Sequence, residues 1–483
     1  MQLWAVQRIL GILLMVFSFT LVPPILVSLL HGDGETTPFV DAFLITLGLG
    51  LLSWLPVRRM HRDLRLRDGF VVVVMFWTVL SAIGALPFAL SERPEVSITD
   101  SFFESVSGLT TTGATVIIGL DDLPPSILYY RQQLQWLGGM GIIVLAVAVL
   151  PMLGIGGMQL YRAETPGPMK DAKLTPRITE TAKALWYIYL GLTVACALAY
   201  WVAGMNLFDA VGHSFSTVAI GGFSTHDASM GYFNSVAIDM VAVVFMFASG
   251  VNFSLHFVAF RQRSLIGYLQ DSEFKFYAAL LGLVVLLTTI GLYASGTFRN
   301  PWDALLQGLF QGVSIGTTAG FTTAAFYDWP GHVAILLLFA SFVGGCAGST
   351  GGGIKVIRVL LLVKQGVREI TRLVHPSAQI PVRVGDKTIS PRVVEAVWGF
   401  FALYVASFTA MYLLLAATGI ELLTAFSAVA ACINNLGPGL AGVGAHYADL
   451  NDAAKWVLCF AMLLGRLEIF TLLVLLSPAF WRR

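Results

Sequence analysis

The sequence reads SGLTTTGAT at residues 107–115, and three related stretches follow it along the chain: STVAIGGFST at 216–225, SIGTTAGFTT at 314–323 and CINNLGPGL at 432–440. The four stretches align on one glycine each: Gly113, Gly222, Gly320 and Gly437. Three of them carry a serine six residues before that glycine, and the fourth has Ala431 there. A long repeat with its glycine at a constant place predicts an architecture assembled from copies of one unit.

The composition places these copies in a membrane. Of the 483 residues, 57% are hydrophobic and only 12% are charged, whereas soluble proteins average about 25% charged residues. We expect ten helices that cross the bilayer, at residues 4–30, 38–57, 70–91, 129–153, 184–204, 234–260, 274–296, 331–363, 392–418 and 453–478. The first run is too long for a signal peptide and lacks a small-residue cleavage site, so we expect it to be retained.

Positive charge is distributed unevenly along the chain. Most of the 29 Lys and Arg residues lie in the connections after the second, fourth, sixth and eighth expected spans, or at the C-terminal Arg482 and Arg483. Because Lys and Arg accumulate on the cytoplasmic side, both termini are predicted to be cytosolic. Acidic residues in the opposite connections would either raise the local cation concentration or be ordinary solvated groups. The four cysteines and eight histidines show no pairing or ligand spacing, so no metal cofactor is predicted.

A short segment precedes the glycine of each repeat. These segments start near Asp100, Asp209, Asp303 and Glu421 and are too short to cross a bilayer. Their first turns carry Asp, Asn, Pro or Glu, as helix N-termini prefer, and their ends are rich in Gly and Thr. A short helix followed by irregular backbone between two spans predicts a re-entrant loop, which is tolerated only inside protein or along a watery path.

The residues around the four glycines predict a cation site made of backbone oxygens. None of the repeat cores contains Asp, Glu or His, so carbonyl groups would have to replace the water around an ion, as in potassium filters. A glycine allows backbone angles that align successive carbonyls. The alternative is that each glycine mediates close helix packing in the membrane. Four copies in register, each after a short capped helix, favour the filter.

The motifs SGLTTTGAT, FSTVAIGGFST, SIGTTAGFTT and INNLGPG, with LLGRLEIF near the C-terminus, resemble the TrkH branch of the Trk/Ktr/HKT superfamily of cation transporters over essentially the whole chain. The resemblance implies an all-α polytopic membrane protein with four pseudo-fourfold helix–pore-loop–helix repeats after an N-terminal helix pair. It also implies potassium uptake, a homodimer and a cytosolic nucleotide-binding ring, TrkA. Glycine at the four key positions accompanies potassium selectivity in this family, and a serine in the first repeat accompanies sodium preference. Pro438 departs from the other loops and suggests less strict selectivity.

By position, the resemblance assigns the potassium-binding filter to three residues in each repeat: Thr111, Thr112 and Gly113; Ile220, Gly221 and Gly222; Thr318, Ala319 and Gly320; and Asn435, Leu436 and Gly437. The K⁺ ion would be bound by their backbone carbonyls and is the substrate, with Rb⁺ and Na⁺ as further candidate ions.

Two features bear on gating. Residues 344–353 read GGCAGSTGGG, which predicts a broken helix, with a tightly packed helix crossing as the alternative. The family uses a flexible loop here as a barrier, which implies the gate residues Gly344, Gly345, Gly348, Gly351, Gly352 and Gly353.

We expect Lys355 and Arg358 to be interfacial anchors. Arg466 lies within the last expected span, and the resemblance makes it a pore barrier; the alternative is a buried ion pair with another span.

These inferences divide the chain into an N-terminal two-helix extension at residues 1–69 and repeats at 70–183, 184–273, 274–391 and 392–483. They predict potassium uptake across the bacterial inner membrane through a gated pore.

The alternative of proton-coupled symport by alternating access is disfavoured because the repeats are parallel and carry few central carboxylates. A membrane enzyme is disfavoured because no nucleophile–base cluster or phosphate loop is present. No nucleic-acid partner and no covalently bound cofactor are expected. The basic connections at residues 159–183 and 364–391 are either solvated loops or docking sites for the ring.

Overall fold

The computed structural model describes residues 2–59, 66–144, 178–385 and 387–482. These residues form helices joined by loops and 3₁₀ turns, with a single small hairpin in which β1 (Arg383–Val384) pairs antiparallel with β2 (Lys387–Thr388). The prediction of an all-α membrane protein is confirmed. Within the described residues, six helices are long and apolar enough to cross a membrane, or eight if each of two bent helix pairs counts as one span.

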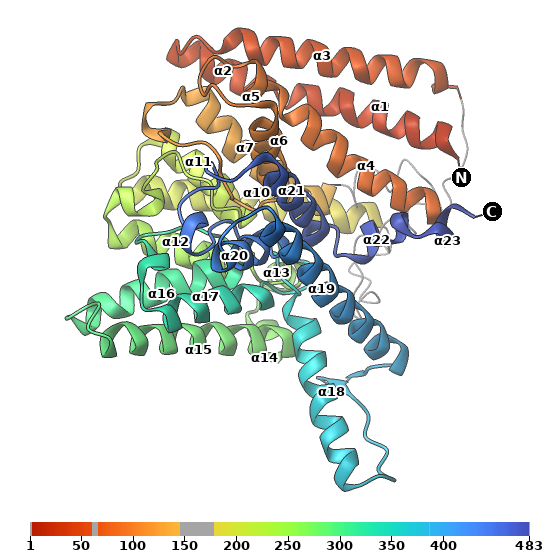
Figure 1. Cartoon of the computed structure of the whole chain (residues 1–483), viewed down its shortest axis with the longest axis vertical. Helices are drawn as coiled ribbons and strands as arrows, with labels where there is room; N and C mark the ends of the chain where they lie inside the picture. Colours follow the sequence, from red (N-terminus) through yellow and green to blue (C-terminus); the bar gives the residue numbers. More distant parts are fainter. Residues whose placement is uncertain (1, 60–65, 145–177, 386, 483) are drawn as a thin grey trace.

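The N-terminal extension is a helical hairpin that packs on the outside of the first repeat. It consists of α1 (Leu3–Phe19), α2 (Val22–His31), α3 (Thr36–Trp54) and η1 (Leu55–Val57). α1 and α3 lie side by side (Figure 1) and approach closely, because a Cβ on Gly11 would lie only 2.9 Å from the Gly50 carbonyl oxygen. α1 contacts α4 (Leu66–Gly84), and α2 contacts α7 (Pro125–Val144), so the hairpin covers the long helices of the first unit.

Four units of the same design follow. Each consists of a long helix, a short buried helix and a second helix: α4, α6 (Ile98–Leu109) and α7; α10 (Ile178–Val202), α11 (Leu207–Ala219) and α12 (Val236–Ser249); α15 (Ser272–Ala294), α16 (Pro301–Thr317) and α17 (Gly331–Val343); and α19 (Pro391–Ala417), α20 (Leu422–Ile433) and α21 (Asp452–Arg466). A 3₁₀ turn follows the glycine loop in every unit: η2 (Leu120–Asp122), η5 (Ser229–Phe233), η6 (Phe326–Asp328) and η7 (Ala441–Val443).

The short helices begin where the sequence predicts because a side chain caps each of them. Ser97 accepts a hydrogen bond from the Asp100 amide, and Asn206 accepts one from the Asp209 amide. The third and fourth short helices are capped in the same way, by Asn300 and Glu421. Each cap satisfies an amide group that the first helical turn leaves without a partner. The four helices are 12, 13, 17 and 12 residues long, too short to span a bilayer.

The units close into a ring. The second helix of each unit packs against the short helix of the next unit, through the pairs α7 with α11, α12 with α16, α17 with α20 and α21 with α6. The last pair joins the fourth unit back to the first. The packing order is therefore cyclic, with the four short helices at the centre of the molecule and the long helices around them.

Among the described residues, three expected spans are interrupted by a loop or by a sharp bend. The eighth ends as α17 at Val343 and resumes as α18 (Val356–Val374), so the helix is broken at residues 344–355 and is not a continuous packed helix. The sixth and tenth were predicted to be continuous, and that prediction is wrong. α12 and α13 (Phe253–Gln262) meet at 95°, and α21 and α22 (Phe470–Leu476) meet at 118°. In the second bend, Glu468 and Ile469 adopt positive φ, which stops the helix although neither is glycine.

The remaining helices lie at the ends of these units. α5 (Leu86–Leu90) continues α4, α14 (Ile266–Gln270) precedes α15, and α23 (Pro478–Trp481) is near the C-terminus. α18 extends away from the rest of the helices, next to the β1–β2 hairpin and the start of α19 (Figure 1). The end of the fourth expected span and most of the basic connection at residues 159–183 lie outside the described residues.

Candidate functional site

The four short helices end in the same hydrogen-bonded turn. In each, the amide of the residue before the repeat glycine donates to a carbonyl five residues back: Thr112 to Ser107 at 2.9 Å, Gly221 to Ser216, Ala319 to Ser314 and Leu436 to Ala431 at 2.8 Å. The amide of the preceding residue donates to a carbonyl three residues back in all four units. This is the Schellman arrangement. In this turn the serine that recurs in three repeats contributes its backbone carbonyl, which Ala431 supplies equally well.

The residue at the centre of each turn is left-handed although it is not glycine. Thr111, Ile220, Thr318 and Asn435 have φ of 54°, 55°, 71° and 52°. This conformation is most unfavourable for β-branched residues such as Ile220, and it costs a residue other than glycine roughly 1–2 kcal/mol. Strain at the same position of four loops is of the kind that functional sites store. The repeat glycine, two residues later, also has positive φ, whereas the residue between the two does not. The sign of φ therefore alternates along three successive residues of each loop.

Each repeat glycine contacts the loop of the next unit, and together these contacts form a second ring. A Cβ on Gly113 would overlap the carbonyl oxygen of Gly221, one on Gly222 that of Ala319, and one on Gly320 that of Leu436. A Cβ on Gly437 would lie 2.7 Å from the carbonyl oxygen of Thr112, which returns the ring to the first unit. Each glycine is therefore required twice, for its φ and for the approach of the neighbouring loop. Only the first requirement was predicted.

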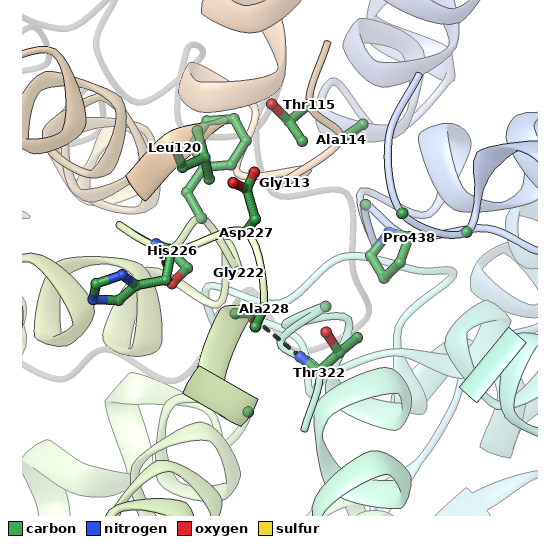
Figure 2. A pocket seen from close by; sticks show the side chains of 18 of the residues that line it. Gly113, Ala114, Thr115, Leu120, Gly222, His226, Asp227, Ala228, Thr322 and Pro438 are labelled. Atoms are coloured by element: carbon green, nitrogen blue, oxygen red, sulfur yellow. Dashed lines mark hydrogen bonds between the residues drawn. The ribbon is translucent and has the colours of Figure 1, made fainter. Parts of the chain in front are cut away.

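The residues that follow the glycines line a cavity of about 360 Å³. Figure 2 shows Gly113, Gly222, Thr322 and Pro438, one from each unit, around this space. Pro438, the departure of the fourth loop, lies against its neighbour, because its Cδ is 2.9 Å from the position of a Cβ on Gly320. Among the described residues, no group of three or more His, Cys, Asp or Glu side chains could hold a metal ion.

His226 connects two units at the edge of this cavity. Its Nδ1 lies 2.5 Å from Asp121 of the first unit, and its Nε2 lies 3.4 Å from Asp209 at the start of α11. The imidazole stacks on Tyr232 with 3.4 Å between ring centroids. Burial alone would lower the pKa of His226, but the hydrogen bonds to Asp209 and Asp121 raise it above its usual value. The contact between the two units is therefore stronger when His226 is protonated.

Residues 344–355 lie on the opposite side of the loops from the cavity, because they contact residues that precede the glycines. The Thr350 hydroxyl donates to the Val218 carbonyl at 2.9 Å, and the Gly352 amide donates to the Thr318 hydroxyl at 2.7 Å. The Gly353 amide donates to the Asn434 carbonyl at 3.0 Å. The segment thus contacts the C-terminal ends of α11, α16 and α20. We call residues 344–355 the intramembrane loop.

The six glycines of the intramembrane loop serve two purposes. Gly344, Gly348 and Gly353 have φ of 70°, 72° and 74°, which a side chain would resist. The other three permit close contact instead, because a Cβ would meet the Ser349 hydroxyl at Gly345, the Thr317 carbonyl at Gly351 and the Asn434 carbonyl at Gly352. The loop is therefore packed closely on itself and against the C-terminal ends of α16 and α20.

Arg466 is at the C-terminal end of α21, and its side chain is buried. The guanidinium donates to the Gly138 carbonyl at 2.7 Å and to the Thr350 carbonyl at 3.3 Å, and it lies 5.3 Å from the centre of the Trp77 ring. It therefore bridges the intramembrane loop and α7. Glu468, two residues after Arg466, pairs with Arg358 at 2.5 Å.

The expectation that Lys355 and Arg358 are interfacial anchors is wrong. Both are buried, with 7% and 4% of their surface exposed. The Lys355 ammonium donates to the Gly351 carbonyl, within the intramembrane loop. Arg358 pairs with Glu468 and lies 4.2 Å from the centre of the Phe400 ring. Their position after a glycine-rich break suggested the end of a span, whereas the break lies in the interior of the protein.

Sequence reasoning missed a polar cluster behind the first two loops. Arg131, Gln132 and Gln135 of α7 hydrogen-bond to the backbone of residues 221–224, and Arg131 pairs with Glu104 at 2.8 Å. The available signal was RQQLQ at residues 131–135, because such a polar run inside an expected span requires buried partners.

Comparisons with known proteins support one family. The family described as "TrkH: Cation transport protein" matches residues 36–483. The chain is 60% identical to the Trk system potassium uptake protein TrkH of Vibrio parahaemolyticus serotype O3:K6 and 54% identical to that of Escherichia coli K12, with full coverage of both chains in each case. The crystal structure of the potassium transporter TrkH from Vibrio parahaemolyticus matches with a TM-score of 0.92 at 57% identity, and it also covers both chains fully.

Proposed function

This chain belongs to the TrkH family of cation transport proteins, and from that premise we propose that it takes up potassium through a pore whose narrowest part is made of backbone oxygens. The potassium uptake proteins to which it is similar are transporters, and the chain has no enzymatic role. The observation that supports the pore best is the cyclic contact of the four loops, in which each repeat glycine lies against a carbonyl of the next unit.

The ion would be held at this ring by the carbonyls of the twelve filter residues. Positive φ at the residues on either side of the middle residue would allow successive carbonyls of a loop to face one side, toward an ion shared by the four loops. Rings of carbonyls can replace the water shell of K⁺. The C-terminal ends of the four short helices, which carry partial negative charge, lie directly before the ring and favour a cation there.

The intramembrane loop and Arg466 would form the closed gate. The loop contacts the ends of three short helices, and Arg466 links it to α7, so an ion that leaves the filter would meet both. The guanidinium charge adds an electrostatic barrier at low dielectric. Opening requires the loop to leave these contacts.

We further propose that the protein acts in the bacterial inner membrane with both termini cytosolic, as a homodimer regulated by a TrkA-like nucleotide-binding ring. The alternating positive connections support this orientation. The basic connection at residues 364–391 contains the end of α18 and the β1–β2 hairpin, and α18 extends away from the other helices (Figure 1). This connection is therefore our candidate for the surface that meets a cytosolic ring.

The test is ion flux in proteoliposomes with K⁺, Rb⁺, Na⁺ and Li⁺, for the wild type and Gly113→Ser. We expect the wild type to prefer K⁺ and the variant to lose part of this preference, because a side chain at Gly113 forces the Gly221 carbonyl away. Gly296→Ser is the matched control: Gly296 also has positive φ, at 74°, but a Cβ there meets no atom within 4 Å. Equal Na⁺ and K⁺ rates in wild type and Gly113→Ser would refute the carbonyl filter.

The second candidate is proton-coupled symport. Reversal potentials measured across a pH gradient decide between the two: a pore gives a potential set by K⁺ alone, whereas coupling shifts it with the proton gradient.

A further inference from the structure

The second filter loop is held from outside its own unit. Three side chains of α7, in the first unit, hydrogen-bond to its backbone. Arg131 donates to the Ser224 carbonyl at 3.0 Å, and Gln132 donates to the Phe223 carbonyl at 3.1 Å. Gln135 donates to the Gly221 carbonyl at 2.5 Å. These contacts cover the carbonyls on both sides of Gly222.

Gln135 makes two contacts with this loop. Its amide nitrogen donates to the Gly221 carbonyl, and its amide oxygen accepts from the Phe223 amide at 3.0 Å. One side chain therefore spans the glycine and fixes the peptide groups before and after it. The side chain of Gln135 is completely buried. Burying an amide in a membrane protein is unfavourable without such partners.

A buried ion pair fixes the helix face that carries these side chains. Arg131 Nε donates to Glu104 of α6 at 2.8 Å, and its guanidinium lies 4.3 Å from the centre of the Phe223 ring. Glu104 also accepts from the Val116 amide at 3.0 Å. The first loop, the second loop and α7 are thereby joined in one network.

The third and fourth loops have a different support near the glycine. The Phe321 carbonyl accepts from the Ser314 hydroxyl at 2.7 Å, and the Gly437 carbonyl accepts from the Tyr447 hydroxyl at 2.7 Å. In both cases the donor belongs to the same unit as the loop, although Thr322 of the third loop also hydrogen-bonds to Ser229 and Gly231 of the second unit. The Gly221 carbonyl differs because its donor comes from the preceding unit, so its position depends on how α7 sits against α11.

We propose that Gln135 is a specificity-determining residue that, with Arg131 and Gln132, holds the Gly221 carbonyl at the distance that suits K⁺. This proposal rests on the proposed function. A carbonyl that accepts a hydrogen bond from a rigid amide cannot move inward to coordinate a smaller ion, and it offers that ion a weaker field. Selectivity between K⁺ and Na⁺ depends on cavity size and on the number and field strength of the carbonyls. The filter is therefore least adaptable at its second loop.

The test compares Gln135→Met with Gln133→Met by K⁺ and Na⁺ flux in proteoliposomes. Met has a similar volume to Gln but neither donates nor accepts these bonds. Gln133, two residues away on the same helix, donates instead to the Thr20 carbonyl of the N-terminal extension, at 2.6 Å. We expect Gln135→Met to keep K⁺ flux but to lower the K⁺/Na⁺ flux ratio by about two- to tenfold, the effect of one or two hydrogen bonds. Gln133→Met should keep the wild-type ratio.

A wild-type ratio in folded Gln135→Met overturns the proposal, as does an equal fall in Gln133→Met, since both outcomes show that the bonds to the loop do not set selectivity. If Gln135→Met does not fold, Gln132→Met decides. It removes only the bond to the Phe223 carbonyl, and the proposal then requires a smaller fall in the ratio. A wild type that does not discriminate K⁺ from Na⁺ refutes the proposed function itself, and this result is distinguishable because it appears before any substitution.

Discussion

Replacing Gly352 with alanine is expected to favour the open state of the intramembrane loop. A Cβ at this position would overlap the carbonyl oxygen of Asn434 and would lie 3.2 Å from the Cβ of Asn435. Gly352 does not have positive φ, so alanine is compatible with its backbone. The penalty therefore arises from the contact with the end of α20 alone, and it disappears when the loop moves away.

The magnitude follows from what the new methyl group displaces. Its nearest neighbour is a backbone carbonyl that cannot rotate away, and overpacking of this kind costs about 1–3 kcal/mol. The same Asn434 carbonyl accepts from the Gly353 amide at 3.0 Å, so a shift of the loop also weakens a hydrogen bond that contributes about 1 kcal/mol. A closed state destabilised by about 2 kcal/mol shifts the equilibrium toward opening by about 30-fold.

The assay is K⁺ flux into proteoliposomes that contain the purified chain alone. We expect Gly352→Ala to conduct at least about tenfold faster than the wild type. Gly366→Ala is the matched control, because Gly366 lies on α18 and a Cβ there meets no atom within 4 Å. Flux that stays at the wild-type level in a folded Gly352→Ala protein would refute the reasoning, since the loop would then not obstruct the path.

Two further predictions concern charged side chains. Arg466→Gln removes the guanidinium that donates to the carbonyls of Thr350 and Gly138, so K⁺ flux through the purified chain should rise several-fold; an unchanged flux would leave Arg466 a structural role only. The raised pKa of His226 means that its contacts stabilise the fold fully below the usual pKa of 6.5, and that this contribution is lost as the pH rises through the raised value. The melting temperature should therefore fall more steeply from pH 6 to about 8 in the wild type than in His226→Gln. The corresponding loss in the free energy of unfolding is under about 1 kcal/mol, and parallel plots of melting temperature against pH for the two proteins would contradict this prediction.

The local features of the fold could be read from the sequence because each depends on residues close together in the chain. The caps of the short helices lie within three residues of the amides they satisfy, as Ser97 and Asn206 do. The break at residues 344–355 follows from the density of glycine there, since glycine lowers helix stability wherever it occurs. The long apolar runs predicted most of the spans for the same reason.

Several misses involve contacts between distant residues. The bend after Arg466 depends on positive φ at Glu468 and Ile469, which residues other than glycine rarely adopt, so the local sequence does not predict it. Lys355 and Arg358 were placed at an interface because basic residues next to an apolar run usually lie there. Their partners, the Gly351 carbonyl and Glu468, show that the chain turns back into the protein.

The sequence by itself determined that four copies of a helix and a glycine-containing loop would be buried in a membrane protein, because hydropathy, capping and backbone freedom are properties of neighbouring residues. Only the tertiary structure decided that Gly113 lies against the carbonyl of Gly221, that Gly437 returns the ring to Thr112, and that Gln135 supports the second loop. These contacts join residues that are 86 or more positions apart in the chain. Their distances depend on how whole helices pack, which no short stretch of sequence specifies.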